Sequence, residues 1–177
     1  MENSQALASA IRSVPDFPKK GIVFRDITTL LKDKEAYRHY VDSVCEHYSG
    51  QHIDKVVGIE SRGFIAGGAL AYLLGAGFVP IRKPGKLPAE KIRQGYELEY
   101  GSDAVEMHRD AITKGERILI HDDLLATGGT IEAACKLVEQ LGGNIVGLSF
   151  LVELSFLHPR KRLPHYDIFS LVSYESE

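Results

Sequence analysis

One stretch in the middle of the chain, residues 118–130, constrains the fold of this sequence more than any other. It begins with an apolar run, residues 118–120, that predicts a buried strand, and two adjacent carboxylates follow at Asp122 and Asp123. A turn of small residues, 126–130, then leads into residues 131–141, which have the apolar spacing of a helix. The first N–H groups of a helix lack internal partners and carry the positive end of its dipole, so an anion is favoured there. Gly128 and Gly129 let the backbone approach such an anion closely. The stretch therefore predicts a phosphate site.

The two carboxylates make this prediction more specific. A surface turn in which Thr130 caps the helix is the simplest interpretation of the same residues, and capping is compatible with phosphate binding. However, Asp122 and Asp123 directly follow the expected strand, where carboxylates are costly unless they contact hydroxyls, a metal ion or hydrogen-bond donors. Beside an anion site, these requirements favour a phosphorylated sugar as the ligand.

Apolar periodicity elsewhere predicts a chain in which strands alternate with helices. The expected helices are residues 4–14, 34–49 and 64–74, the expected strands are 55–59, 78–82, 144–152 and 168–173, and a hairpin is expected over 96–100 and 104–107 with its turn near 101–103. Alternation of this kind is typical of a mainly parallel, doubly wound α/β sheet with binding loops at the carboxyl ends of its strands. At 177 residues, the chain has the size of a single domain.

Two further segments carry charge toward the same edge of the expected sheet. Residues 60–63 follow a strand as the acidic pair does, so Arg62 is expected to bring a cation to a second anionic group, with a salt-bridged turn as the alternative. Residues 82–93 hold five cations, one carboxylate and two prolines. This composition fits either a solvated loop or a lid that closes over a polyanion.

Composition and motifs argue against several other classes of protein. The net charge of -3, from 21 basic and 24 acidic residues, argues against a general binder of nucleic acids or membrane surfaces. Gly58 and Gly63 have P-loop spacing, but Phe64 and Ile65 stand where that motif requires Lys and Ser or Thr. Dinucleotide-binding, metalloprotease and hydrolase motifs are not found either. Two distant cysteines, with no signal peptide and no membrane-spanning run, predict a cytoplasmic protein without disulfides.

The central stretch, with Asp122 and Asp123 running into residues 126–130, resembles the signature of the type I phosphoribosyltransferases. Further segments similar to one branch of that family extend over essentially the full chain: residues 23–27, 60–64, 82–83, 86–88 and 98–101. The resemblance implies one domain over residues 1–177 on a doubly wound sheet. It also implies an N-terminal base-binding hood over residues 1–33 and a flexible lid and hairpin over residues 83–108.

The activity of the family becomes an expectation for this chain. The resemblance implies transfer of the 5-phosphoribosyl group from 5-phosphoribosyl 1-pyrophosphate to adenine, with AMP and pyrophosphate as the products of this purine-salvage reaction. Mg²⁺ is expected as cofactor, held by substrate oxygens and water near Asp122 and Asp123 and by no direct protein ligand. The implied partners are these small molecules and a second copy of the chain in a homodimer, with no nucleic acid and no membrane.

The resemblance also assigns roles to individual residues. The expected catalytic groups are Glu99, Asp122 and Asp123, and Tyr100 is expected in the lid. The remaining assignments are, for the 5′-phosphate and ribose, Ala126, Thr127, Gly128, Gly129 and Thr130; for pyrophosphate, Ser61, Arg62, Arg82, Lys83 and Lys86; and for the base, Val23, Phe24, Arg25 and Leu124. Considered without the family, Phe24 would be interpreted as a core aromatic; the resemblance makes it a platform for the base.

Two alternatives to this function remain at the level of sequence. The first is the same scaffold with guanine or xanthine specificity, against which stands a hood that precedes the sheet. The second is a regulator that binds 5-phosphoribosyl 1-pyrophosphate without catalysis, against which stand Glu99 and the cationic lid. Two departures from the family pattern also stand out. His121 replaces the usual apolar residue before the acidic pair and is expected to be structural, and residues 89–95 match no family segment and receive no role.

Overall fold

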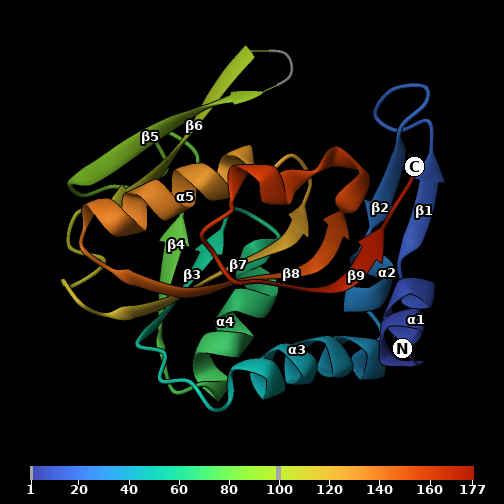
Figure 1. Ribbon diagram of the computed structural model, residues 1–177, viewed down its shortest axis with the longest axis horizontal. Helices are drawn as coiled ribbons and strands as arrows, with labels where there is room; N and C mark the ends of the chain where they lie inside the picture. Colours follow the sequence, from blue (N-terminus) through green and yellow to red (C-terminus); the bar gives the residue numbers. More distant parts are fainter. Residues whose placement is uncertain (1, 99–100) are drawn as a thin grey trace.

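The computed structural model describes residues 2–98 and 101–177. Its centre is a five-stranded sheet in the order β4-β3-β7-β8-β9, in which every pairing is parallel (Figure 1). The strands are β3 (Lys55–Ile59), β4 (Gly77–Ile81), β7 (Arg117–Leu125), β8 (Asn144–Leu154) and β9 (Ile168–Tyr174). The predicted parallel α/β sheet is therefore confirmed. The four strands expected outside the central stretch begin and end close to the residues predicted for them.

Helices cover both faces of this sheet. α3 (Lys34–Tyr48) and α4 (Gly63–Leu73) lie on one face, and α5 (Gly129–Gln140) lies on the other (Figure 1). Successive side chains of a strand point to opposite faces, so Ile118 and Ile120 pack with the α5 core whereas Leu119 packs with the α3 and α4 core. Burial on both faces explains why the start of β7 is a continuous apolar run without alternation.

The N-terminal segment contacts β9 and carries its own two-stranded sheet (Figure 1). α1 (Glu2–Ala10) leads to β1 (Arg12–Pro15), which pairs antiparallel with β2 (Val23–Asp26), and α2 (Thr28–Leu31) leads on to α3. We call α1, β1, β2 and α2 the hood. The expected helix over residues 4–14 is wrong in its last part. Residues 12–15 instead join β2 as a strand, a long-range pairing that local periodicity does not reveal.

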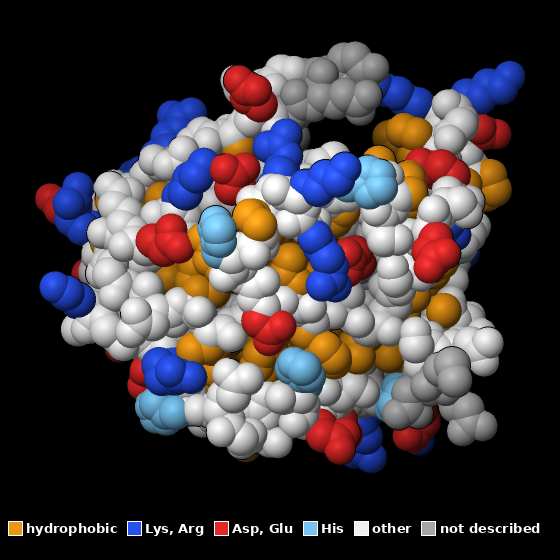
Figure 2. Space-filling view, viewed as in Figure 1, with side chains coloured by type: hydrophobic (Ala, Val, Ile, Leu, Met, Phe, Trp, Pro, Cys, Tyr) orange, Lys and Arg blue, Asp and Glu red, His pale blue; other side chains and the backbone are white. Residues whose placement is uncertain are grey.

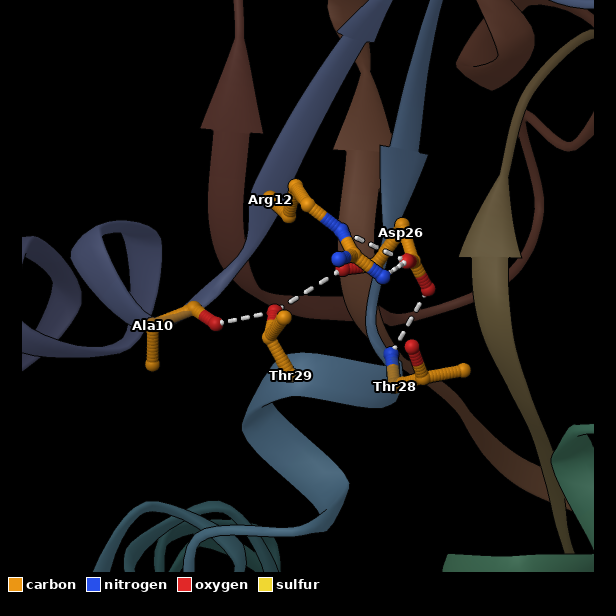
Figure 3. A network of polar contacts seen from close by, with 5 residues as sticks. All are labelled: Ala10, Arg12, Asp26, Thr28 and Thr29. Carbon is orange, nitrogen blue, oxygen red and sulfur yellow. Dashed lines mark hydrogen bonds and ion pairs between the residues drawn. The ribbon is translucent and has the colours of Figure 1, made fainter.

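A polar network fixes the end of β2 to α1 and α2 (Figure 3). Arg12 Nε lies 3.0 Å from Asp26 Oδ2, and the N–H of Thr28 donates to Asp26 Oδ1 at 2.9 Å. The hydroxyl of Thr29 donates to the carbonyl of Ala10 at 2.7 Å. Hydrogen bonds from Thr28 and then from Arg12 lower the pKa of Asp26 to about 2. The strand that carries the predicted base-binding residues is thus anchored at this end.

A long hairpin lies on the opposite side of the sheet from the hood (Figure 1). β5 (Lys91–Leu98) pairs antiparallel with β6 (Gly101–His108), and Leu98 stands opposite Gly101. The expected turn at 101–103 is therefore wrong, because these residues already belong to β6. Residues 91–95, which received no role from the sequence, form most of β5. A bridge between Arg82 and Glu106 ties the hairpin to the end of β4.

Two short 3-10 helices, η1 (Ser155–Leu157) and η2 (Pro159–Arg162), connect β8 to β9. Charged side chains of both signs are interspersed over the face shown in Figure 2, which agrees with the small net charge. Among the described residues, none of the helices combines the length and the hydropathy needed to cross a membrane.

Candidate active site

The order of the strands changes direction between β3 and β7. From β3 the chain moves outward to β4, and it then returns to the other side of β3 to form β7. Open α/β sheets bind their ligands in the crevice that such a reversal leaves at the carboxyl ends of the strands. Here the crevice holds a cavity of about 420 Å³ lined by residues 59–62, Lys83 and residues 122–131. The expectation that the loops after β3 and β7 open on one edge is confirmed.

The turn after β7 leads directly into α5. Gly128 is the N-cap residue with a φ of 85°, and the first intrahelical bond joins the N–H of Glu132 to the carbonyl of Gly128 at 2.9 Å. The N–H groups of Gly129 and Thr130 precede this bond, so they have no partner within the helix. A Cβ on Gly128 would lie 3.1 Å from the carbonyl of Pro159, so glycine suits both the φ and the space. Thr130 is not the N-cap, and that sequence interpretation is wrong.

The acidic pair lies within β7 and not in the loop after it. β7 continues to Leu125, and Asp122 stands opposite Phe150 of β8. The strand extends beyond its expected end because the ladder with β8 continues after the apolar run stops. Burial, and then the neighbouring Asp123, raise the pKa of Asp122 well above its usual range, and burial also raises the pKa of Asp123. Such a pair is stabilised by a hydroxyl or a positive charge placed against it.

Arg62 connects the acidic pair to the hood. Its Nε lies 2.7 Å from Asp123 Oδ2, and its guanidinium carbon lies 5.5 Å from the centroid of the Phe24 ring. Ser61, joined to Glu60 by a cis peptide bond, also lines the cavity. Both predicted pyrophosphate residues of this loop therefore lie at the cavity, with the charge of Arg62 directed at Asp123.

The three other predicted pyrophosphate residues are placed differently from one another. Lys83 lines the cavity, and its ammonium group forms an ion pair with Asp103 of β6. Arg82 donates two hydrogen bonds to the carboxylate of Glu60, at 3.0 and 3.2 Å, and does not line the cavity. Lys86 is exposed in the connection between β4 and β5. The structure thus brings Lys83 to the site and leaves Arg82 and Lys86 outside the cavity wall.

The predicted base-binding residues come from the hood and from β7. Phe24 is half-buried, packs edge-on against Phe17 at 5.3 Å between ring centroids, and belongs to neither buried core, so it is not a core aromatic. Leu124 lines the cavity. The guanidinium of Arg25 donates to the hydroxyl of Ser13 at 2.6 Å, so this side chain binds the hood itself.

His121 lies beneath the acidic pair, on the face of β7 that α3 covers. Its Nε2 lies 2.8 Å from the hydroxyl of Tyr40 and its Nδ1 lies 2.8 Å from the hydroxyl of Ser149. Burial lowers the pKa of His121 to about 3, so the imidazole is neutral. A neutral imidazole has one donor and one acceptor, and a hydroxyl can match either. His121 therefore joins α3, β7 and β8, which agrees with its expected structural role.

Sequence reasoning missed the residues that hold Lys83. Its ammonium group donates to the hydroxyl of Tyr96 at 2.9 Å as well as contacting Asp103, and these two residues stand opposite each other across the hairpin. The observed register pairs these two residues, whereas a turn at 101–103 would not have done so. Glu99 and Tyr100, predicted as a catalytic and a lid residue, lie outside the described residues.

The expected magnesium ion can be compared with the possible metal ligands that the structure places at the cavity. Within residues 2–98 and 101–177, no group of three or more His, Cys, Asp or Glu side chains is placed to hold a metal ion. The carboxylates that line the cavity are those of Glu60, which is paired with Arg82, and of Asp122 and Asp123.

The parallel sheet, the glycine turn of residues 126–130 that opens α5 and the acidic pair near the end of β7 together define a phosphoribosyltransferase. Residues 26–175 match the family model described as phosphoribosyl transferase domain. An adenine phosphoribosyltransferase of Acidobacterium capsulatum is 61% identical over 97% of this chain and 95% of its own length. The adenine phosphoribosyltransferase of Thermotoga maritima is 57% identical over 93% of this chain and 95% of its own length. The chain belongs to the adenine phosphoribosyltransferase family.

Solved structures agree with this assignment. The adenine phosphoribosyltransferase of Thermoanaerobacter pseudethanolicus superimposes with a TM-score of 0.94 at 52% identity, covering 97% of this chain and 99% of that one. The enzyme of Saccharomyces cerevisiae, in complex with an imino-altritol bisphosphate and adenine, superimposes with a TM-score of 0.90 at 41% identity. The match covers 96% of this chain and 98% of that one. The type I phosphoribosyltransferase fold expected from the sequence is confirmed.

Proposed function

We propose that this chain transfers the 5-phosphoribosyl group of 5-phosphoribosyl 1-pyrophosphate to adenine and releases AMP and pyrophosphate, which makes it a glycosyltransferase of purine salvage. The observation that carries the proposal is the single cavity in which a phosphate loop, the acidic pair and Arg62 meet, next to the half-buried ring of Phe24. A phosphate, sugar hydroxyls, a pyrophosphate and a flat base are the ligand groups that these elements suit.

The phosphate loop and the acidic pair would hold the ribose 5-phosphate part of the donor. The N–H groups at the start of α5 and the hydroxyls of Thr127 and Thr130 would bind the 5′-phosphate, where the helix dipole favours a negative charge. Asp122 and Asp123 would accept hydrogen bonds from the ribose 2′ and 3′ hydroxyls. The raised pKa values of both carboxyls support this role, because new donors would stabilise their charged forms.

Donor binding would require Arg62 to exchange partners. Its ion pair with Asp123 holds together one residue proposed for pyrophosphate and one proposed for the sugar. When Arg62 turns to the pyrophosphate oxygens, Asp123 becomes available to the sugar hydroxyls. Ser61 and Lys83 line the same cavity and would add donors, and Arg82 and Lys86 would reach the pyrophosphate only after moving from their present positions.

The base would lie between Phe24 and Leu124, with its edge against backbone groups of Val23 and Arg25. The N–H of Val23 donates to a carboxylate oxygen at 2.8 Å, so it is directed at an acceptor. An N–H donor selects an unprotonated ring nitrogen. Adenine offers such a nitrogen at position 1, whereas hypoxanthine, guanine and xanthine carry a proton there. This preference supports adenine over the 6-oxopurines.

The proposed chemistry is displacement at the anomeric carbon through an oxocarbenium-like transition state. Asp122 and Asp123 would stabilise the positive sugar by charge, and the hairpin and hood would exclude water. Glu99 would hold or remove the proton of the purine ring nitrogen, assisted by Tyr100 in the lid. Mg²⁺, when bound with the donor through substrate oxygens and water near the acidic pair, would offset the negative charge of the leaving pyrophosphate.

We also propose a cytoplasmic homodimer whose chain forms one domain over residues 1–177, with the hood in residues 1–33 and the lid and hairpin in residues 83–108. Large apolar side chains are exposed together around α4 and the edge strand β4, as expected of a surface that a second copy covers: Ile65, Tyr72, Leu73 and Phe78. The two free cysteines fit a reducing compartment.

A spectrophotometric assay with adenine, hypoxanthine, guanine and xanthine, each with the donor and Mg²⁺, tests the function. We expect turnover with adenine and far less with the other three. Equal or greater turnover of a 6-oxopurine would favour the guanine or xanthine alternative. Tight donor binding without pyrophosphate release for any base would favour the non-catalytic regulator.

A further inference from the structure

The segment that follows β9 folds back onto the hood strand β2. The guanidinium carbon of Arg25 lies 3.9 Å from the centroid of the Tyr174 ring, and its Nη2 lies 3.5 Å from the carbonyl oxygen of Ser176. The hydroxyl of Ser155 donates to the carbonyl of Tyr174 at 2.9 Å. Figure 1 shows this end of the chain beside β1 and β2. Residues 174–176 are therefore held against the hood by contacts from β2 and from η1.

This placement delivers the side chain of Glu177 to the backbone of β2. Glu177 Oε2 accepts a hydrogen bond from the N–H of Val23 at 2.8 Å, across 154 positions of sequence. The residue after Val23 is Phe24, whose ring lies over Arg62 and thus next to the acidic pair. The Glu177 carboxylate consequently binds a backbone donor of the same strand that carries Phe24.

The same donor has a role in the proposed function, on which this inference rests. The base would need to present an acceptor to the N–H of Val23, and a carboxylate oxygen is an acceptor of the same kind with a stronger charge. One N–H cannot make a well-aligned hydrogen bond to both. We propose that Glu177 competes with the purine base for Val23, so that the C-terminal segment lowers the apparent affinity for adenine.

The size of the effect follows from the exposure of the contact. Glu177 is exposed, so water competes with its hydrogen bond and the bond is weak. A base that binds only when the segment is released has its apparent dissociation constant raised by the inverse of the released fraction. We expect that removing the carboxylate lowers the KM for adenine roughly three- to tenfold, which corresponds to about 0.7–1.4 kcal/mol. The donor binds elsewhere, so its KM stays unchanged.

Steady-state kinetics of Glu177→Ala and Glu177→Gln, with adenine and donor varied in turn, test the proposal. Glu177→Ala should lower the KM for adenine with kcat and the donor KM unchanged. Glu177→Gln keeps a neutral acceptor, so its KM for adenine should lie between those of Glu177→Ala and the wild type. Glu175→Ala is the matched control, because Glu175 is an exposed acid of the same segment with no contact to Val23 in the described structure, and it should behave as the wild type.

Hydrogen exchange at the Val23 amide provides a readout that does not depend on catalysis. Exchange should be faster in Glu177→Ala than in the wild type and in Glu175→Ala. If the wild type converts adenine but Glu177→Ala has an unchanged or higher KM for adenine, the competition is refuted and the function stands. If the wild type makes no AMP from adenine, the proposed function fails and the competition fails with it. Unchanged exchange at Val23 in Glu177→Ala would refute the contact itself.

Discussion

Replacing His121 by leucine should lower the free energy of unfolding, because the buried imidazole contacts two hydroxyls that leucine cannot satisfy. His121, Tyr40 and Ser149 are each 1% exposed or less, and the imidazole is the partner of both hydroxyls. His121→Leu leaves two buried hydroxyls unsatisfied, each at about 1–3 kcal/mol. The buried leucine side chain regains about 1–2 kcal/mol. With both terms near the middle of their ranges, the expected loss in free energy of unfolding is about 2–3 kcal/mol.

Urea denaturation at fixed protein concentration measures this loss. With a slope of about 2 kcal/mol per molar urea, the midpoint should fall by about 1–2 M while the slope stays constant. The triple variant Tyr40→Phe, His121→Leu, Ser149→Ala removes both orphaned hydroxyls and should recover most of the stability. A triple variant no more stable than His121→Leu would show that the hydroxyls are not the cause.

The pH dependence of the same difference has a defined sign. Burial holds the pKa of His121 at about 3 in the folded chain against 6.5 for an ordinary histidine, so between these values the unfolded chain binds a proton that the folded chain does not. The wild type therefore loses stability as pH falls below 6.5, by up to about 1.4 kcal/mol per unit, and the leucine variant lacks this term. The stability gap should be largest above pH 6.5 and should narrow in acid. Equal stability at pH 7.5, or a gap that does not change between pH 7.5 and 5.5, would refute the reasoning.

Three further predictions concern the site. Asp123→Ala should lower kcat by about 10²-fold or more because a charge facing the cationic sugar is lost, while circular dichroism shows the fold retained; unimpaired activity would remove Asp123 from the site. Gly129→Val should abolish turnover in the same assay, since its Cβ would already be in van der Waals contact with the carbonyl of Glu97 at 3.4 Å and the two methyl groups beyond it would push the start of α5 and the hairpin apart; normal donor KM and kcat would contradict this. Glu99→Gln should lower kcat by about 10²-fold with little change in donor affinity measured by calorimetry, and an unchanged rate would exclude a proton-transfer role.

Much of the site could be read from local sequence. The run from residue 118 to residue 130 encodes a buried strand, a pair of carboxylates and a glycine turn before a helix, and each of these depends on neighbours a few positions apart. The same holds for residues 55–63. Because both units place their loops at the carboxyl end of a strand, any parallel arrangement brings them to one edge. The family resemblance then assigned the groups that a phosphoribosyl donor and a base would contact.

Local patterns were least reliable where a distant segment decided the outcome. Val14 continues the apolar spacing of α1, yet residues 12–15 form β1 because β2 offers them a ladder. The strand β7 extends through Asp122 and Asp123 because β8 pairs with it there, although the residues are polar. The hairpin turn was displaced because the alternation of β5 and β6 alone leaves the register open.

The sequence by itself thus determined the strand-loop-helix units, the parallel sheet and the chemistry at the end of β7, because periodicity and turn composition are properties of neighbouring residues. Only the tertiary structure decided the pairings between distant segments: Arg62 with Asp123, Lys83 with Asp103, and Val23 with Glu177. These contacts join residues 20 to 154 positions apart. Charge and spacing do not select one partner among the many acids and bases of this chain. The selection follows from the strand order and from the packing of the hood and hairpin against it.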